Sequence, residues 1–93
     1  MSDKIQIKVI ISGRVQGVFF RQETRKTALG LGLKGYVKNL ANGSVEAVFQ
    51  GKNHDVDLAI EWCHQGPPIS IVNSIIKGEA EPLTDFQSFK VSY

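Results

Sequence analysis

The order in which two hydrophobic periods follow one another is the feature that most constrains the fold of this chain. Segments in which every second residue is apolar have the period of a half-buried strand, whereas apolar residues three and four apart have the period of a helix. The predicted strands cover residues 5–11, 35–40, 44–50 and 71–80, with a short one over residues 88–93. The predicted helices lie over residues 20–31 and between Asn53, which can cap the second helix, and Gly66-Pro67-Pro68, which ends it.

This order predicts a protein of the α+β class. A βαββαβ pattern with a short C-terminal strand is typical of a ferredoxin-like sandwich, in which two helices cover one face of a mainly antiparallel sheet. Asn42-Gly43 predicts a tight hairpin between the second and third strands. The pattern does not decide which face of the strand over residues 71–80 is buried.

The length of the chain predicts one domain. The sequence has 93 residues, which is enough for one hydrophobic core but not for two. We therefore expect a single domain over residues 1–93. Cys63 is the only cysteine, which excludes an intrachain disulfide, and we expect a monomer whose fold depends on packing.

Charge and hydropathy bear on location and partners. The chain has 11 basic and 9 acidic residues, scattered along it, and a formal net charge of +2, whereas a nucleic-acid-binding face normally carries a basic stripe. The start, Met1-Ser2-Asp3-Lys4, is polar, and the aliphatic run Val9-Ile10-Ile11 is too short for a signal sequence or a membrane span. We expect a cytoplasmic protein that binds neither nucleic acid nor membranes.

The segment between the first strand and the first helix, residues 12–21, has the features of an anion-binding loop. Gly13 and Gly17 allow backbone conformations closed to other residues, and free N–H groups at the turn and the helix start can converge on one ligand. Arg21 falls in the first helical turn, where a guanidinium opposes the helix macrodipole unless an anion is bound. Its planar fork of donors matches two phosphate oxygens at once.

The same segment has a simpler interpretation, a glycine turn followed by a solvated arginine. It is neither a Walker loop, since no Gly-Lys-Ser/Thr follows, nor Gly-x-Gly-x-x-Gly. It also lacks a Cys, Ser or His placed to attack a phosphoryl group. Arg14, within the segment, is expected to be solvated.

Asn39 is predicted to reach the same place from the second strand. A right-handed crossover leaves the C-terminal ends of the first two strands at one edge of the fold, beside residues 12–21. There the Asn39 carboxamide can accept a hydrogen bond from a water molecule and hold it for attack on a bound phosphoryl group. The alternative is that Asn39 is a turn residue ahead of the hairpin, a role that Asn commonly fills.

Two segments of the sequence together resemble the signatures of the acylphosphatase family. They read Gly13-x-Val15-Gln16-Gly17-Val18-x-Phe20-Arg21 and Gly35-Tyr36-Val37-Lys38-Asn39-x-x-x-Gly43-x-Val45-x-x-x-x-x-Gly51. Both are complete and in the family's order and separation, and the resemblance extends over essentially the whole chain. It implies the same ferredoxin-like fold. We expect a small free-standing enzyme, because the related domains of large carbamoyl-transferring maturation proteins are followed by more chain.

The resemblance also implies a reaction and the residues that carry it. The reaction is hydrolysis of a small-molecule acyl phosphate to a carboxylate and inorganic phosphate, and we expect no cofactor and no metal ion. Arg21 and Asn39 are the implied catalytic residues, with Asn39 orienting the attacking water. The implied phosphate-binding residues are Val15, Gln16, Gly17, Val18, Phe19 and Arg21.

Two other functions fit the same fold. Lys34-Gly35-Tyr36 mimics the start of an RNP1 motif and would suit an RRM-like nucleic-acid-binding module, but Val37 and Lys38 break the motif. The loop and Arg21 alone would also suffice for a module that binds a phosphorylated ligand without hydrolysing it.

Other chemically capable residues have plainer interpretations. Cys63 and His64 point about 100° apart on a helix, so we expect a core thiol and a surface imidazole. Charged residues near the start of the second helix could form a metal site, but the favourable interaction of acidic residues with the helix dipole explains them more simply. The residues concerned are His54, Asp55, Asp57 and Glu61. Phe19 and Phe20 are expected to anchor the loop in the core, with the acyl pocket as the alternative place for Phe19.

Overall fold

The computed structural model describes residues 3–93, in which five strands and two helices follow one another in the predicted order. They are β1 (Lys4–Arg14), α1 (Phe20–Gly30), β2 (Lys34–Asn39), β3 (Val45–Lys52), α2 (Asn53–Gln65), β4 (Ile71–Lys77) and β5 (Phe89–Ser92). Residues 1–2 of the expected domain and of its polar start lie outside the described residues. Neither helix within residues 3–93 has the length and apolar content that a membrane crossing needs.

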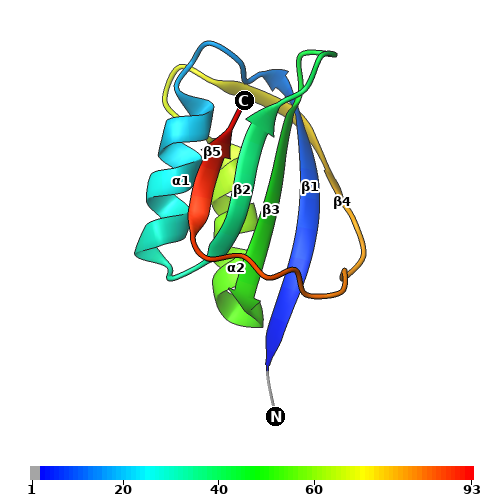
Figure 1. Ribbon diagram of the computed structural model, residues 1–93. Helices are drawn as coiled ribbons and strands as arrows, with labels where there is room; N and C mark the ends of the chain where they lie inside the picture. The colour runs from blue at the N-terminus through cyan, green and yellow to red at the C-terminus, as the bar shows by residue number, and fades with distance from the viewer. Residues whose placement is uncertain (1–2) are drawn as a thin grey trace.

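The strands form one sheet in the order β4-β1-β3-β2-β5, with both helices on one face (Figure 1). Neighbouring strands are antiparallel except β2 and β5, which run parallel. The prediction of a ferredoxin-like α+β sandwich is confirmed. The parallel edge strand makes the sheet mixed, and it brings the end of β5 to the same side of the molecule as the end of β2.

The core lies between the sheet and the helices, and it fixes where α1 begins. Phe20, the first residue of α1, is buried and packs against Trp62 of α2 with ring centroids 5.6 Å apart. Phe49 of β3 stacks on Phe89 of β5 at the same centroid distance. Burial of a large apolar side chain contributes about 1.5–3 kcal/mol, so these contacts hold α1 and β5 firmly against the rest of the fold.

A bulge settles which residues of β4 face the core. The register with β1 shifts between Ser12 and Gly13, so that Asn73 is an extra residue on β4. A bulge of this kind interrupts the two-residue period of a strand. Val72 and Ile75, which would face opposite sides of a regular strand, therefore both pack against the core.

Some boundaries differ from the predictions. The N-cap of α2 is Lys52, and no side chain caps the helix, so the predicted cap at Asn53 is wrong and Asn53 is instead the first helical residue. The fourth strand ends at Lys77 rather than residue 80, because the chain leaves the sheet there to cross its open face.

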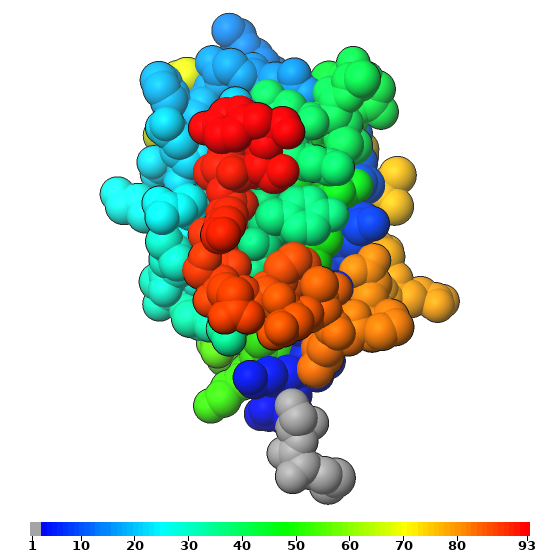
Figure 2. Space-filling model, in the orientation of Figure 1, coloured from blue at the N-terminus to red at the C-terminus, as the bar shows by residue number. Residues whose placement is uncertain are grey.

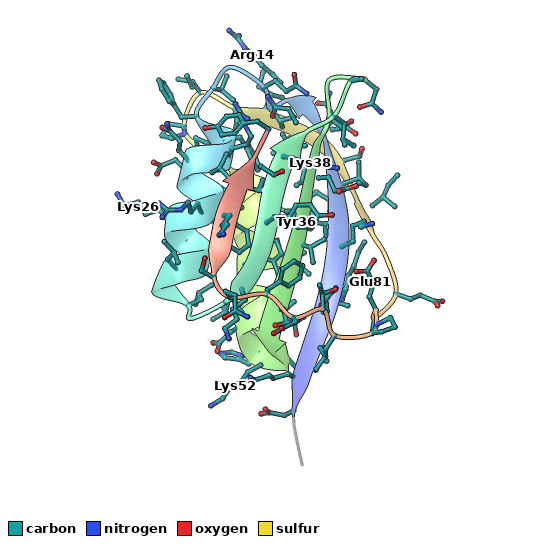
Figure 3. The ribbon with its side chains drawn as sticks, in the orientation of Figure 1. Arg14, Lys26, Tyr36, Lys38, Lys52 and Glu81 are labelled. Carbon is teal, nitrogen blue, oxygen red and sulfur yellow. The ribbon has the colours of Figure 1, made fainter. Side chains whose placement is uncertain are left out.

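The segment over residues 78–88 returns the chain across the open face of the sheet to β5 (Figures 1 and 3). Gln6 holds it there, with its Nε2 donating to Glu81 and Thr84 and its Oε1 accepting from the Thr84 N–H. Gln50 donates to Gln6 at 2.9 Å and to the Thr84 carbonyl at 2.7 Å. Because buried polar groups need partners, this network fixes the path that leads to the C-terminal strand.

Candidate active site

The C-terminal ends of β1, β2 and β5 and the start of α1 meet at one end of the fold (Figure 1). They enclose a hollow of about 200 Å³. Arg21 and Asn39 both line it, as the crossover argument predicted. The full set of lining residues is Val15, Gly17, Phe19, Phe20, Arg21, Gln22, Asn39, Val91 and Tyr93.

The loop between β1 and α1 carries unpaired backbone donors. Gly17 has φ 73°, and Phe19 has φ 65°, the only positive φ of a non-glycine residue among residues 3–93. In this described part of the chain, no backbone carbonyl accepts from the N–H groups of residues 15–19. Alternation of left-handed and right-handed residues turns successive N–H groups toward one point, which is the geometry of an anion-binding concavity.

Gly13 serves the packing of the sheet rather than the hollow. A Cβ at Gly13 would collide with the backbone carbonyl oxygen of Ile71 and lie 2.8 Å from the backbone nitrogen of Asn73. A Cβ at Gly17 would meet nothing within 4 Å. A glycine is therefore required for different reasons at the two positions: close approach of β4 at Gly13, near the end of β1, and backbone conformation alone at Gly17, in the loop.

The side chain of Gln16 ties the loop to the hairpin between β2 and β3. Its Nε2 donates to the carbonyls of Leu40 at 2.8 Å and Ser44 at 2.9 Å. A second link joins the Ser12 and Ser44 hydroxyls at 3.2 Å. Gln16 does not line the hollow with its side chain, so only its backbone N–H remains as a candidate ligand for phosphate. No local pattern in the sequence signals this bracing role of Gln16.

The hydrophobic residues of the loop divide between core and hollow. Val18 and Phe20 are buried, so Val18 can face the hollow only through its backbone, and Phe20 anchors the helix start as expected. Phe19 is 66% exposed and lines the hollow. The expectation that Phe19 is a core anchor is therefore wrong, because its left-handed backbone turns the side chain outward.

Asn39 has an unsatisfied buried acceptor. Its Oδ1 is the only buried side-chain nitrogen or oxygen within residues 3–93 that lacks a hydrogen-bond partner. Leaving such an acceptor unpaired costs about 1–3 kcal/mol. The turn of the hairpin is made elsewhere, by Asn42, whose Oδ1 accepts from the Ser44 N–H at 3.0 Å. The interpretation of Asn39 as a turn residue is thus disfavoured, and the acceptor capacity of its oxygen is unused among residues 3–93.

Arg21 faces the hollow without a carboxylate partner. The ion pairs among residues 3–93 join Lys8 to Glu81 and Lys38 to Glu46 and do not involve it. Its guanidinium carbon instead lies 4.9 Å from the centroid of the Tyr93 ring. Sequence reasoning missed Tyr93, because the parallel pairing of β5 with β2 leaves no local signal in the sequence.

The remaining candidates stand apart from the hollow. Burial raises the pKa of the Cys63 thiol to about 12, and His64 is exposed, so the expected core thiol and surface imidazole are confirmed. Residues 3–93 contain no group of three His, Cys, Asp or Glu side chains close enough to hold a metal ion. Arg14 is exposed and extends away from the fold (Figure 3).

The open face of the sheet offers little for stacking bases. The Tyr36 hydroxyl donates to Glu46 Oε2 at 2.7 Å, and the rings of Tyr36 and Phe86 meet edge to face with their centroids 6.1 Å apart. Burial, the hydrogen bond and the negative charge of Glu46 raise the pKa of this phenol. A ring that is already partnered in this way does not present a free platform of the RRM kind.

Comparison with known proteins finds similarity over nearly the whole chain. Residues 7–91 match the family model described as Acylphosphatase. Over 88 residues the sequence is 44% identical to the acylphosphatase of Syntrophus aciditrophicus (strain SB), which covers 95% of this chain and 92% of that protein. Among solved structures, an acylphosphatase from Coxiella burnetii superposes with a TM-score of 0.92 at 40% identity, covering 97% of this chain and 94% of the other. The acylphosphatase from Bacillus subtilis gives a TM-score of 0.92 at 34% identity, covering 96% and 99%.

Proposed function

The chain belongs to the acylphosphatase family and hydrolyses acyl phosphates, and we propose that the hollow at the start of α1 is where the reaction takes place. Water adds its oxygen to phosphorus, the bond from phosphorus to the acyl oxygen breaks, and a carboxylate leaves. One observation carries the proposal above the others: Asn39, whose buried Oδ1 lacks a partner among residues 3–93, lines the same hollow as Arg21.

The phosphoryl group binds to the loop and Arg21. The N–H groups of residues 15–19 have no partner within the described chain, and the first N–H groups of α1 add the positive end of the helix dipole. The guanidinium of Arg21 supplies two parallel donors to phosphate oxygens. Hydrogen bonds to charged groups each contribute about 1.5–3 kcal/mol, so this set is sufficient to hold a dianion.

Asn39 orients the attacking water. Its Oδ1 accepts one of the water's hydrogens, which leaves a lone pair of the water oxygen to approach phosphorus opposite the leaving carboxylate. A phosphoryl oxygen takes the remaining proton. The leaving carboxylate is a weak base and needs no acid to protonate it, so the protein contributes position and charge rather than a covalent intermediate.

Two substitutions separate binding from turnover. Arg21→Gln is expected to weaken both inhibition by inorganic phosphate and hydrolysis of acetyl phosphate, whereas Asn39→Ala is expected to lower kcat and spare phosphate inhibition. Loss of one donor or one water-positioning group corresponds to about 100- to 1,000-fold in rate. Hydrolysis in ¹⁸O-labelled water should place the label in phosphate and not in the carboxylate.

Three results would overturn the assignment. The first is near-parental hydrolysis by Arg21→Gln, and the second is Asn39→Ala with lost phosphate affinity but an unchanged kcat. The third is label in the carboxylate, which would move the attack from phosphorus to the acyl carbon. Lys52→Gln, an exposed cation at the far end of β3, is the matched control for removal of a positive charge (Figure 3).

The proposal also covers the domain organisation, oligomeric state, location and metal requirement of the protein. Residues 1–93 act as one monomeric, cytoplasmic unit that needs no metal ion and binds no nucleic acid. The weakly basic leaving group supports a reaction without a metal ion, and the scattered charges of the sequence support the absence of nucleic-acid binding. Full activity in EDTA, a monomeric mass by light scattering and no shift of labelled RNA in a gel are the expected results, and a contrary result in any assay removes that part of the proposal.

A further inference from the structure

The ring of Tyr93 has no role in the chemistry proposed above, although it lies against the central cation. The Arg21 guanidinium carbon is 4.9 Å from the ring centroid, a distance at which a cation is attracted to the face of an aromatic ring. Arg21 forms no ion pair or side-chain hydrogen bond with any residue from 3 to 93. Among residues 3–93, the ring is therefore the only group that makes a cation–π contact, ion pair or side-chain hydrogen bond with the guanidinium.

The parallel pairing of β5 with β2 places Tyr93 beside the other catalytic candidate. The register pairs Val37 with Val91 and Lys38 with Ser92. Tyr93, the residue directly after β5, therefore comes level with Asn39, the last residue of β2. Figure 2 shows the C-terminal end of the chain on the surface between α1 and the end of β2. Tyr93 and Asn39 both line the hollow.

Tyr93 contributes little to the core. It is 98% exposed and absent from the buried core, so packing against the core does not explain its position. A role at the hollow can therefore be separated from a role in stability, because a substitution of Tyr93 removes the ring without leaving a cavity.

An aromatic ring suits a cation that must bind an anion. A carboxylate in the same place would occupy the N–H donors of Arg21 and cancel its charge, whereas a ring meets the flat face of the guanidinium and leaves the N–H edge free. The ring also offsets the unfavourable placement of a cation at the positive end of α1, before any anion is bound.

We propose that Tyr93 is a positioning residue, whose ring holds the Arg21 guanidinium in place in the empty hollow with its N–H edge free for the phosphoryl group. Without the ring, the long side chain of Arg21 is ordered only when substrate binds, and that ordering subtracts from affinity. The inference rests on the proposed role of Arg21 in phosphate binding.

Substitutions of Tyr93 test the ring directly. Tyr93→Leu is expected to raise the inhibition constant of inorganic phosphate and the KM for acetyl phosphate two- to fivefold, as expected for an exposed cation–π contact of about 0.5–1 kcal/mol, with a smaller change in kcat. Tyr93→Phe and Tyr93→Trp keep a ring and should remain closer to the parent, with Trp at least as tight as Phe. The thermal midpoint should stay unchanged in all three, because the ring is exposed.

A double-mutant cycle tests whether the effect passes through Arg21. Phosphate affinity is measured from shifts of the loop amide signals by NMR, which detects weak binding even when hydrolysis is lost. In the Arg21→Gln background, Tyr93→Leu is expected to have no further effect on phosphate affinity, since the cation is absent. Tyr36→Leu is the matched control: it removes the ring 5.9 Å from the Lys38 ammonium, on the open face, and should leave phosphate affinity as in the parent.

The outcomes distinguish this inference from the proposed function. Unchanged phosphate affinity in Tyr93→Leu overturns the role of the ring, and equal losses in the Leu and Phe variants assign the effect to the hydroxyl instead. An undiminished loss in the Arg21→Gln background shows that Tyr93 acts without Arg21 and also overturns the inference. Near-parental phosphate binding and hydrolysis by Arg21→Gln alone is a failure of the proposed function instead, whatever the Tyr93 variants do.

Discussion

Phe19 is held in a backbone conformation that phenylalanine rarely adopts. Its φ of 65° and ψ of 19° lie in the left-handed region, at a cost of roughly 1–2 kcal/mol for a residue with a Cβ. Val18 and Phe20 on either side of it are buried, and their packing imposes the conformation. The strain therefore sits in the loop that turns its N–H groups toward the hollow, where functional sites commonly store it.

Replacing Phe19 by a residue that tolerates the left-handed region should stabilise the protein. Phe19→Asn is expected to raise the free energy of unfolding by about 0.5–1 kcal/mol, because Asn adopts this conformation more readily and the exposed ring loses little burial. Urea denaturation, followed by tryptophan fluorescence, measures the change.

A β-branched residue provides the opposite case. Phe19→Val should lower the free energy of unfolding, because branching at Cβ makes the left-handed region still less accessible. If the Asn variant proves less stable than the Val variant, backbone strain at Phe19 is not the dominant effect.

At the scale of elements, the loop after β1 is held against two neighbours by different means. Gln16 of the loop and Ser12 near the end of β1 form hydrogen bonds with the hairpin between β2 and β3, and Gly13 of β1 allows β4 to approach closely. The hydrogen bonds of Gln16 and Ser12 set the distance between the loop and Asn39. The close approach of β4 at Gly13 sets the path of β1 as it enters the loop.

Loss of the Gln16 hydrogen bonds should affect both stability and catalysis. Gln16→Leu removes one of the two hydrogen bonds that each carbonyl accepts, since Leu40 O also accepts from the Gly43 N–H and Ser44 O from the Leu40 N–H. We expect the free energy of unfolding to fall by about 1–3 kcal/mol for the two hydrogen bonds lost. We also expect kcat/KM for acetyl phosphate to fall, because the loop and Asn39 are no longer held in register. Gln65→Leu, a change of an exposed side chain on α2, is the control; equal effects of the two changes would contradict the bracing role.

Gly13 and Gly17 should respond differently to the same added methyl group. Gly13→Ala is expected to lower the free energy of unfolding by about 3 kcal/mol or more, because overpacking against the backbone of β4 adds to an unfavourable φ. Gly17→Ala should lower it by only about 1–2 kcal/mol, because its Cβ meets open space and only the backbone strain remains. Paired denaturation curves measure the difference, and equal losses at the two sites would show that close approach at Gly13 does not limit stability.

At the scale of the whole molecule, two weak acids are kept protonated on opposite sides of the sheet. Cys63 lies in the helix-covered core, where burial raises its pKa from 9.0 to about 12. Tyr36 lies on the open face, where burial and Glu46 raise the pKa of its phenol above the ordinary value of 10.0. Both groups bind their protons more tightly in the folded than in the unfolded state.

Folding stability should therefore fall in alkaline solution. The unfolded state releases these protons first as the pH rises, so the contribution of the two groups is complete below about pH 9 and is lost as the pH rises through the folded-state pKa values. Urea denaturation between about pH 8 and about pH 10.5 should show a falling free energy of unfolding. Tyr36→Phe should make the fall shallower above about pH 10, and a slope identical to that of the parent would exclude the Tyr36 phenol as a contributor.

Local pattern was sufficient to predict the elements and two of the residues at the hollow. The periods of residues 5–11 and 20–31 specify a strand and a helix because each buries one side of a regular backbone. The handedness of the crossover then places Arg21 and Asn39 at one end of the fold. Family resemblance added the expected phosphate-binding residues of the loop, whose roles stay predictions.

The bracing by Gln16, the bulge at Asn73 and the ring of Tyr93 were decided only by the tertiary structure. Each depends on which backbone atoms of a distant segment come within a few ångströms, and no local period or propensity encodes that distance. Hydrophobic patterning by itself determined which faces of the chain must be buried and in what order the elements occur. Strand register and loop packing determined which polar groups meet, because hydrogen bonds and ring contacts vanish over displacements that leave hydrophobic burial almost unchanged.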